Sequence, residues 1–140
     1  MAEQNDWNLA LRTLTAPKDA NHQGSVFGGV ILSLIDQAGY VECRRHGVHR
    51  WVTIAMQAVE FHRPVWMGDV VTLFTRTART GRTSVTVEVR VEVERYSTGA
   101  REHVTTATVT LVATDANGTP IPYSGPPSMP LARTEPIGGG

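Results

Sequence analysis

One acidic residue, Asp36, stands within the most apolar helical pattern of the sequence. Residues 28–46 carry apolar side chains at helical spacing, and aspartate is unfavourable in the middle of such a helix. Burying its carboxylate without a partner costs several kcal/mol. Asp36 lies about 140° round the helix from Ile31, off the main apolar face. We therefore expect it to face a cleft or a subunit seam, where it could act as a general base; a surface position or an ion pair with an arginine is the structural alternative.

Two adjacent glycines, Gly28 and Gly29, begin this helix. Backbone N–H groups in the first helical turn lack intrahelical partners, and glycine lets a ligand approach them closely. They could form an oxyanion hole for a carbonyl that becomes negative in a transition state. Alternatively, the glycine pair only permits close packing of the helix on a sheet. Asp36 lies about 10–12 Å further along the axis, so a single subunit need not supply the whole site.

Other residues capable of chemistry carry weaker signals. His22 precedes the glycine pair and could act with Asp36 as an acid/base partner, although a solvated loop position is the alternative. Cys43 has no basic neighbour in sequence, which favours a buried, inert thiol. His46 and His49 lie three apart with no further ligand evident, so we expect no metal site.

Two loop segments contain residues that could contact a ligand. Residues 60–69, which include Arg63, could line the mouth of a site or could simply form a tight turn. Residues 79–84 place two arginines and three hydroxyl groups around Gly81. Such a group suits a phosphate, and a solvated hairpin loop is the structural alternative.

The composition narrows the classes of protein to be considered. The 140 residues suit one domain, and 13 basic and 13 acidic side chains leave no net charge. This balance gives no electrostatic basis for binding nucleic acid or an anionic membrane. No stretch approaches the roughly 18 consecutive apolar residues of a membrane span. One cysteine and a polar segment 1–8 indicate neither a disulfide framework nor a secretory signal, so we expect a cytoplasmic protein.

Apolar residues surround much of the helix, which is expected over residues 28–46. One face is expected to carry Ile31, Leu34, Ile35, Ala38 and Val41, and a second flank Leu32, Gly39 and Cys43. A helix that is apolar on more than one side is normally wrapped by other structure.

After the helix, the apolar residues recur at every second position. From Val85 to Val93 every odd position is valine, and the even positions are polar. Other strands are expected at 8–14, 51–61, 70–78 and 105–114, with a turn at 64–68 and hairpin loops at 79–83 and 97–99. Strands joined mainly by hairpins predict an α+β fold, in which a strongly curved antiparallel sheet wraps around one long helix. We assign residues 1–123 to this domain and residues 124–140, rich in proline and glycine, to a C-terminal tail without regular structure, mobile beyond Pro127.

Four blocks of sequence occur in an order that is informative. They are Asn21-x-x-Gly24-x-x-Phe27-Gly28-Gly29-x-Ile31-Leu32-x-x-Ile35-Asp36, Val52-Thr53, Phe61-x-Arg63-Pro64-Val65-x-x-Gly68-Asp69 and Gly81-Arg82-Thr83-Ser84. Together they resemble the hotdog-fold acyl-CoA thioesterases, most of all the short- to medium-chain acyl-CoA hydrolase branch. The resemblance covers about residues 10–123.

This resemblance implies the hotdog fold and a homodimer whose sheets join edge to edge, assembled further into a tetramer or hexamer. The active sites would lie at the dimer interface. Asp36 would act as general base or nucleophile, and the amides of Gly28 and Gly29 would polarise the thioester carbonyl. Thr53 would contribute from across the interface, and Asn21 is a further catalytic candidate.

The resemblance also suggests where the substrate binds. The candidate substrate-binding residues are Gln23, Phe27, Arg63, Gly81, Arg82, Thr83 and Ser84, with the last three near the nucleotide end of coenzyme A. Coenzyme A would enter as part of the substrate, and no other cofactor is expected. Relatives often carry histidine where Phe27 stands and asparagine or aspartate where Ser25 stands. Asn21 and Gln23 are then the nearest candidates for a second polar catalytic residue.

The sequence therefore predicts an acyl-CoA thioesterase that converts acyl-CoA and water into a free acid and coenzyme A. Two alternatives remain. One is a hotdog hydratase or dehydratase that uses His22 and Asp36 on a hydroxyacyl thioester. The other is a non-catalytic module that binds acyl-CoA.

Overall fold

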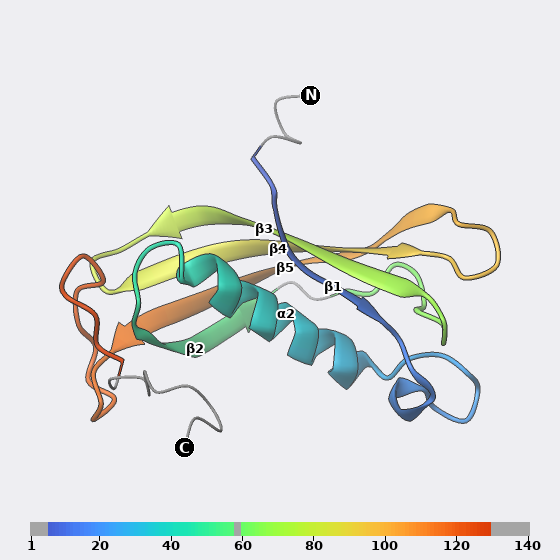
Figure 1. The fold of residues 1–140 in the computed structure, drawn as a ribbon, viewed down its shortest axis with the longest axis horizontal. Helices are drawn as coiled ribbons and strands as arrows, with labels where there is room; N and C mark the ends of the chain where they lie inside the picture. The colour runs from blue at the N-terminus through green and yellow to red at the C-terminus, as the bar shows by residue number, and fades with distance from the viewer. Residues whose placement is uncertain (1–5, 58–59, 130–140) are drawn as a thin grey trace, which may run out of the picture.

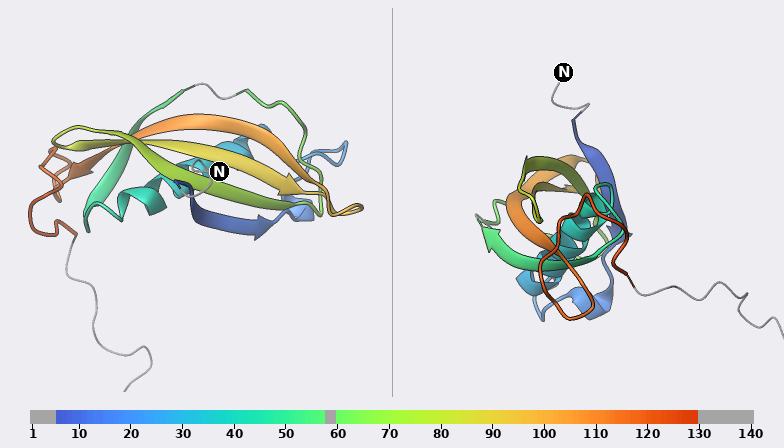
Figure 2. Two further views of the ribbon diagram at one scale, coloured as in Figure 1. Left: turned by 90° about the horizontal axis from the view of Figure 1, so that it is seen from above. Right: turned by 90° about the vertical axis from the view of Figure 1, so that its left-hand side faces the viewer.

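Antiparallel strands form one curved sheet, and helix α2 lies along its concave face (Figure 1). The computed structural model describes residues 6–57 and 60–129. Its elements are β1 (Asn8–Leu14), the short 3-10 helix η1 (Pro17–Asp19), α2 (Gly28–Cys43), β2 (Arg50–Gln57), β3 (Val70–Thr80), β4 (Ser84–Glu94) and β5 (Arg101–Thr114). Seen end-on, the sheet curls around the helix (Figure 2). This arrangement confirms the predicted α+β architecture.

The strands follow the order β1-β3-β4-β5-β2 across the sheet. β3, β4 and β5 pair as two consecutive hairpins, as predicted. β2, however, pairs with β5 and not with β3, so the strands after the helix do not simply follow one another. β2 also ends at Gln57, before the expected end at Phe61. Within the described sheet, β5 is the one neighbour of β2, so β2 lies at an edge.

The core lies between the concave face of the sheet and one side of α2. The five odd-numbered valines of β4 are all buried, and they face the helix as the alternation predicts. Valine and leucine at alternate positions of β3 and β5 extend this layer on both sides: Val71, Leu73, Val109 and Leu111. The polar even positions of β4 lie on the convex face.

Helix α2 packs closely on the sheet through a glycine. A Cβ atom placed on Gly39 would lie 3.3 Å from Leu111 Cδ1 and 3.4 Å from Val109 Cγ1, so a larger residue would push the helix outward. Ile31, Ile35 and Ala38 are buried as expected, but Val41 is 36% exposed and does not belong to the core face. The reason is that the sheet covers the flank that carries Gly39.

The helix ends earlier than the apolar pattern suggested. It stops at Cys43, and residues up to His46 continue as a tighter turn, in which the His46 amide bonds to the Cys43 carbonyl. Within the residues that the structure describes, no helix is long and apolar enough to cross a membrane.

Part of the expected C-terminal tail packs against the start of β2. Ser128 Oγ donates to the Thr114 carbonyl at 2.8 Å, lies 3.1 Å from His49 Nδ1, and accepts from the Arg50 amide at 3.3 Å. Ser128 therefore joins the beginning of β2 to the end of β5. Residues 130–140, most of the stretch expected to be mobile, lie outside the described residues.

Candidate active site

Asp36 lies halfway along α2 and faces the edge strand β2. Thr53 Oγ1 donates a hydrogen bond to Asp36 Oδ1 at 2.5 Å. Asp36 lies off the core face, as the helical spacing predicted, and is only half-buried. No hydrogen bond to its second oxygen, Oδ2, is formed within residues 6–57 and 60–129. One carboxylate oxygen is thus held by a hydroxyl group and the other remains available to a ligand or to water.

The Asp36 carboxylate opens onto a groove between α2 and β2. The groove is lined mainly by apolar and aromatic side chains: Leu11, Asp36, Gln37, Tyr40, Val41, Trp51, Val52, Thr53 and Leu111. Val41 and Val52 are partly exposed at this groove. A carboxylate beside an apolar groove can activate water next to a ligand that carries an apolar group.

Thr53 reaches Asp36 within the same chain. The expectation that Thr53 acts from across a subunit interface therefore differs from the observed geometry. The reason is the position of β2, which pairs with β5 at the sheet edge and turns Thr53 toward the helix opposite Leu111. Thr53 orients the aspartate of its own subunit.

The glycine pair leaves the first amides of α2 free. The Val30 amide bonds to the Phe27 carbonyl, but the Gly28 and Gly29 amides donate to nothing in the described part of the chain. The N-cap residue, Phe27, supplies no side-chain cap. A Cβ on Gly28 would lie 3.5 Å from the Phe61 ring, whereas a Cβ on Gly29 would meet nothing within 4 Å. The helix thus presents two free donors, with open space at Gly29.

Asn21 closes the loop that precedes these donors. Its Oδ1 accepts from the amides of Gln23 at 2.8 Å and Ser25 at 3.3 Å, and its Nδ2 donates to Ser25 Oγ at 2.8 Å. Gly24 completes the turn with φ of 90°, a conformation that favours glycine. Asn21 therefore shapes the loop, while Gln23 and His22 are exposed. No hydrogen bond links His22 to Asp36 in the parts of the chain described here.

The hairpin at Gly81 lies at the opposite end of the molecule from the glycine pair. It joins β3 to β4 near the end of α2, whereas Gly28 and Gly29 lie at the beginning of the helix (Figure 1). The Gly81 amide bonds to the Ser84 carbonyl at 2.8 Å, and the Thr83 carbonyl accepts from Ala113. Arg82 is exposed. One chain thus brings Asp36 and Thr53 together, but separates the glycine pair from the hairpin.

A family model for the thioesterase superfamily matches residues 23–100. The chain belongs to the thioesterase superfamily. This thioesterase is 38% identical over 113 residues to an uncharacterized acyl-CoA thioester hydrolase of Haemophilus influenzae, a match that covers 79% of the present chain and 73% of that relative. It is 36% identical over 116 residues to the acyl-CoA thioester hydrolase YciA of Escherichia coli K12, covering 81% and 88% of the two chains.

Solved structures agree with this assignment. The thioesterase superposes on the hexameric thioesterase y2039 of Yersinia pestis with a TM-score of 0.80 at 36% identity, covering 84% of this chain and 97% of that one. It superposes on Cj0915, a hexameric hotdog fold thioesterase of Campylobacter jejuni, with a TM-score of 0.78 at 39% identity, covering 83% and 90%. The predicted hotdog fold is therefore confirmed.

Arg63, a candidate substrate-binding residue of the thioesterase, is engaged in an ion pair. Its Nε lies 3.0 Å from Glu102 Oε1, and its Nη1 donates to the His103 carbonyl at 3.3 Å. The Arg63 side chain is still half exposed.

His103 lies in β5, next to Arg63. Burial, together with the nearby charges of Arg90 and His62, lowers the pKa of His103 below its usual value.

A buried carboxylate that the sequence analysis missed lies at the end of α2. Glu42 is 3% exposed and accepts hydrogen bonds from Thr75 Oγ1 and Thr77 Oγ1, each at 2.9 Å, and from Asn8 Nδ2 at 3.2 Å.

Burial, and then the charge of Glu42, raise the pKa of Cys43 to about 12. The thiol is thus protonated and inert at neutral pH, as predicted.

The only sequence signal for a buried Glu42 is its position on the flank of the helix that also carries Gly39 and Cys43. Among the described residues, no group of three or more histidine, cysteine, aspartate or glutamate side chains could hold a metal ion.

Proposed function

We propose that this protein hydrolyses acyl-CoA to a free acid and coenzyme A. The observation that carries the proposal is the Asp36 carboxylate, held by Thr53 at an apolar groove. Relatives that are 36–38% identical over most of the chain are named acyl-CoA thioester hydrolases, which supports the same activity here.

In the proposed reaction, Asp36 takes a proton from a water molecule as the water oxygen bonds to the thioester carbon. The tetrahedral intermediate then collapses, the carbon–sulfur bond breaks, and the leaving thiolate takes up a proton to give free coenzyme A. In a second version, an oxygen of Asp36 bonds to the thioester carbon and the carbon–sulfur bond breaks, so that coenzyme A leaves as a thiolate and takes up a proton. Water then hydrolyses the resulting anhydride, which gives the free acid and restores the Asp36 carboxylate. In both versions Thr53 keeps the carboxylate pointed into the groove.

We further propose that the donors for the carbonyl oxygen come from the Gly28 and Gly29 amides of a second subunit. About 10–12 Å of helix separates them from Asp36 within one chain, which is too far for a single carbonyl group. A homodimer would bring the two half-sites together, and the hexameric state of the Yersinia and Campylobacter thioesterases supports such assembly.

The remaining candidate residues take supporting roles in this proposal. The nucleotide end of coenzyme A would lie near the Gly81–Ser84 hairpin, where the exposed Arg82 can meet a phosphate. Phe27 and Arg63 would flank the acyl end of the site. Asn21 would act by shaping the loop before Gly28 rather than by touching the reacting atoms. Coenzyme A enters as part of the substrate, and a cytoplasmic location suits this chemistry.

The decisive experiment is to measure thiol release from a panel of acyl-CoA substrates of increasing chain length. We expect release of coenzyme A that follows Michaelis–Menten kinetics for at least one chain length. Loss of the conjugated absorbance of an enoyl-CoA without thiol release would indicate a hydratase instead. Tight acyl-CoA binding without any turnover would indicate a binding module.

A further inference from the structure

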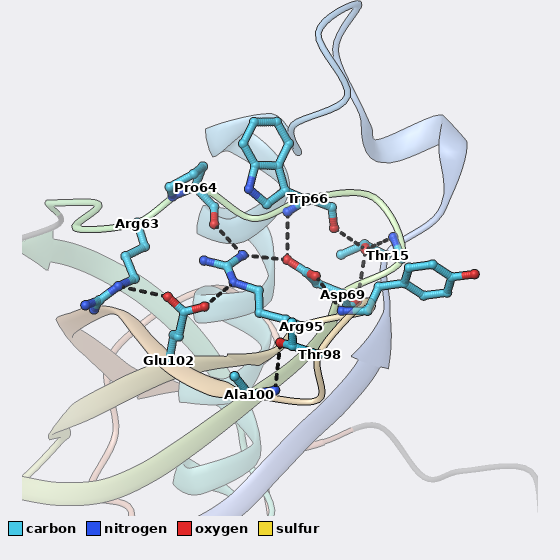
Figure 3. A network of polar contacts seen from close by, with 11 residues as sticks. Thr15, Arg63, Pro64, Trp66, Asp69, Arg95, Thr98, Ala100 and Glu102 are labelled. Atoms are coloured by element: carbon cyan, nitrogen blue, oxygen red, sulfur yellow. Dashed lines mark hydrogen bonds and ion pairs between the residues drawn. The ribbon is translucent and has the colours of Figure 1, made fainter.

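A partly buried ionic cluster lies at the loop that contacts the segment leading into α2, outside the groove of Asp36. Arg95, the residue directly after β4, places its Nη1 2.7 Å from Asp69 Oδ2 and its Nε 2.5 Å from Glu102 Oε2 (Figure 3). The Asp69 side chain is 2% exposed and that of Arg95 is 13% exposed. These contacts raise the pKa of Arg95, chiefly through its hydrogen bond to Glu102, and the same bond lowers the pKa of Glu102. These opposite shifts keep Arg95 and Glu102 charged at neutral pH.

The contacts of Arg95 with Asp69 and Pro64 fix the loop that precedes β3. Arg95 Nη1 also donates to the Pro64 carbonyl at 2.9 Å. Asp69 accepts from the Trp66 amide at 2.9 Å and from the Tyr96 amide at 3.1 Å. Because Asp69 is almost fully buried and bonded on both oxygens, the loop 64–69 has little freedom to move relative to the β4–β5 hairpin.

The same loop holds the segment that leads into α2. The Val26 amide donates to the Val65 carbonyl at 2.7 Å, and the Met67 amide donates to the Gly24 carbonyl at 3.1 Å. An isolated antiparallel bridge joins Ser25 to Trp66 between these two bonds. Residues 65–67 of this loop therefore pair with residues 24–26 immediately before the glycine pair.

The helix has no cap of its own that could fix its first amides. Phe27, the N-cap residue, makes no side-chain capping bond, and Gly28 has no side chain that could lock its backbone. The direction of the Gly28 and Gly29 amides is thus set by the segment before them. That segment is held on one side by the loop that Arg95 fixes. On the other side it is held by residues 19–20, through the bond from the Phe27 amide to the Asp19 carbonyl at 3.0 Å and a bridge between Ala20 and Val26.

We infer that Arg95 is a positioning residue for the reaction: through Pro64 and Asp69 it aims the Gly28 and Gly29 amides at the carbonyl oxygen. This inference rests on the proposed thioesterase function. Oxyanion donors act only when they are pre-aligned, and a shift of about 1 Å in such a group can cost roughly a hundredfold in rate. Arg95 would then influence turnover more than substrate affinity.

The test compares Arg95→Met with Arg76→Met. Arg76 donates through Nε and Nη2 to one oxygen of Glu88, Oε2, on the convex face of the sheet and away from the loop 64–69, so its removal serves as a matched control. We expect Arg95→Met to lower kcat for acyl-CoA by about tenfold or more while KM changes less than about threefold. Arg76→Met is expected to keep both values close to those of the unaltered protein.

A third variant separates the bond of Arg95 to Glu102 from its bonds to Asp69 and Pro64. Glu102→Gln removes the charge of Glu102 but leaves the contacts of Arg95 with Asp69 and Pro64, so it should retain most of kcat. Hydrogen exchange gives a readout that does not depend on activity. We expect the Val26 and Met67 amides to exchange faster in Arg95→Met than in the unaltered protein, and no change in Arg76→Met.

Several results would overturn the inference. One is a folded Arg95→Met variant with unchanged kcat, and another is an equal loss in Arg76→Met. If Arg95→Met does not fold, Asp69→Asn takes its place, with the same expected fall in kcat. Failure of both to fold would also refute the inference, because the cluster would then be required for the whole domain. If the unaltered protein hydrolyses no acyl-CoA, the proposed function fails, and hydrogen exchange still tests whether Arg95 holds the helix entry.

Discussion

Thr53 Oγ1 lies 2.5 Å from Asp36 Oδ1 and thereby joins the edge strand β2 to the middle of α2. The two residues come from elements that meet only because β2 pairs with β5. The hydroxyl donor occupies one oxygen of the carboxylate and directs the other into the groove. A single threonine thus sets the orientation of the proposed catalytic base.

Replacing the carboxylate tests its role in catalysis. Asp36→Asn keeps the size of the side chain and can still accept the bond from Thr53, but it cannot take a proton from water. We expect kcat to fall by about 10²–10⁴-fold. Thiol release measures the activity, and size-exclusion chromatography checks that assembly is unchanged. Normal turnover in a correctly assembled variant would rule out Asp36 as the base or nucleophile.

The Thr53 hydroxyl can be removed without changing the shape of the side chain. Thr53→Val abolishes the bond to Asp36, and since such a bond to a charged group is worth about 1.5–3 kcal/mol, we expect kcat to fall by about tenfold or more. Thr53→Ser retains the hydroxyl and should recover most of the activity. Equal kinetics in the valine and serine variants would show that the hydroxyl does not orient the base.

The buried Glu42 makes a separate prediction about stability. Glu42→Leu leaves the Thr75 and Thr77 hydroxyls and the Asn8 amide without their shared acceptor. We expect the free energy of unfolding to fall by about 2–4 kcal/mol. Urea denaturation measures this, with Glu88→Leu on the convex face as a control that should change little. A double variant with Thr75→Val should recover part of the loss.

The ion pair between Arg95 and Glu102 predicts a dependence of stability on pH. The bond from Arg95 lowers the pKa of Glu102 in the folded protein, so its contribution to stability is fully present above the ordinary value of about 4.3. As the pH falls from that value through the lowered pKa of Glu102, the folded protein also takes up the proton and the contribution is lost. Urea unfolding between pH 7 and pH 3 should show the stability gap between the unaltered protein and Glu102→Gln closing toward acid pH. A gap that stays constant would contradict the assigned ion pair.

The local spacing of apolar residues was enough to predict most of the fold. The alternating valines of β4 and the apolar spacing of α2 determine which side chains face inward, and the structure confirms both. The position of β2 in the sheet could not be predicted from such spacing, because its partner β5 lies far away in the sequence. Val41 was wrongly assigned to the core for a similar reason, since only the position of the sheet decides which flank of the helix is covered.

The candidate site was predictable in part. Asp36 stood out because a carboxylate is unexpected on an apolar helix, and its half-buried position confirms that it leaves the core face. Its bond to Thr53 within one chain depends on strand order, which spacing alone does not reveal. Glu42 gave no comparable signal, since its hydrogen-bond donors come from strands β1 and β3. The ionic cluster of Arg95 likewise joins segments that only the folded topology brings together.

The sheet order has a consequence for how the chain reaches its native state. Asn8 pairs with Thr75, and Arg50 pairs with Thr114. The edge strands β1 and β2 therefore cannot pair until β3 and β5, which are synthesised much later, have left the ribosome. Contacts so distant along the chain are slow to form, because a long loop must close before any pairing stabilises it. During synthesis, the helix and both edge strands therefore emerge before the β3–β5 hairpins that they later flank.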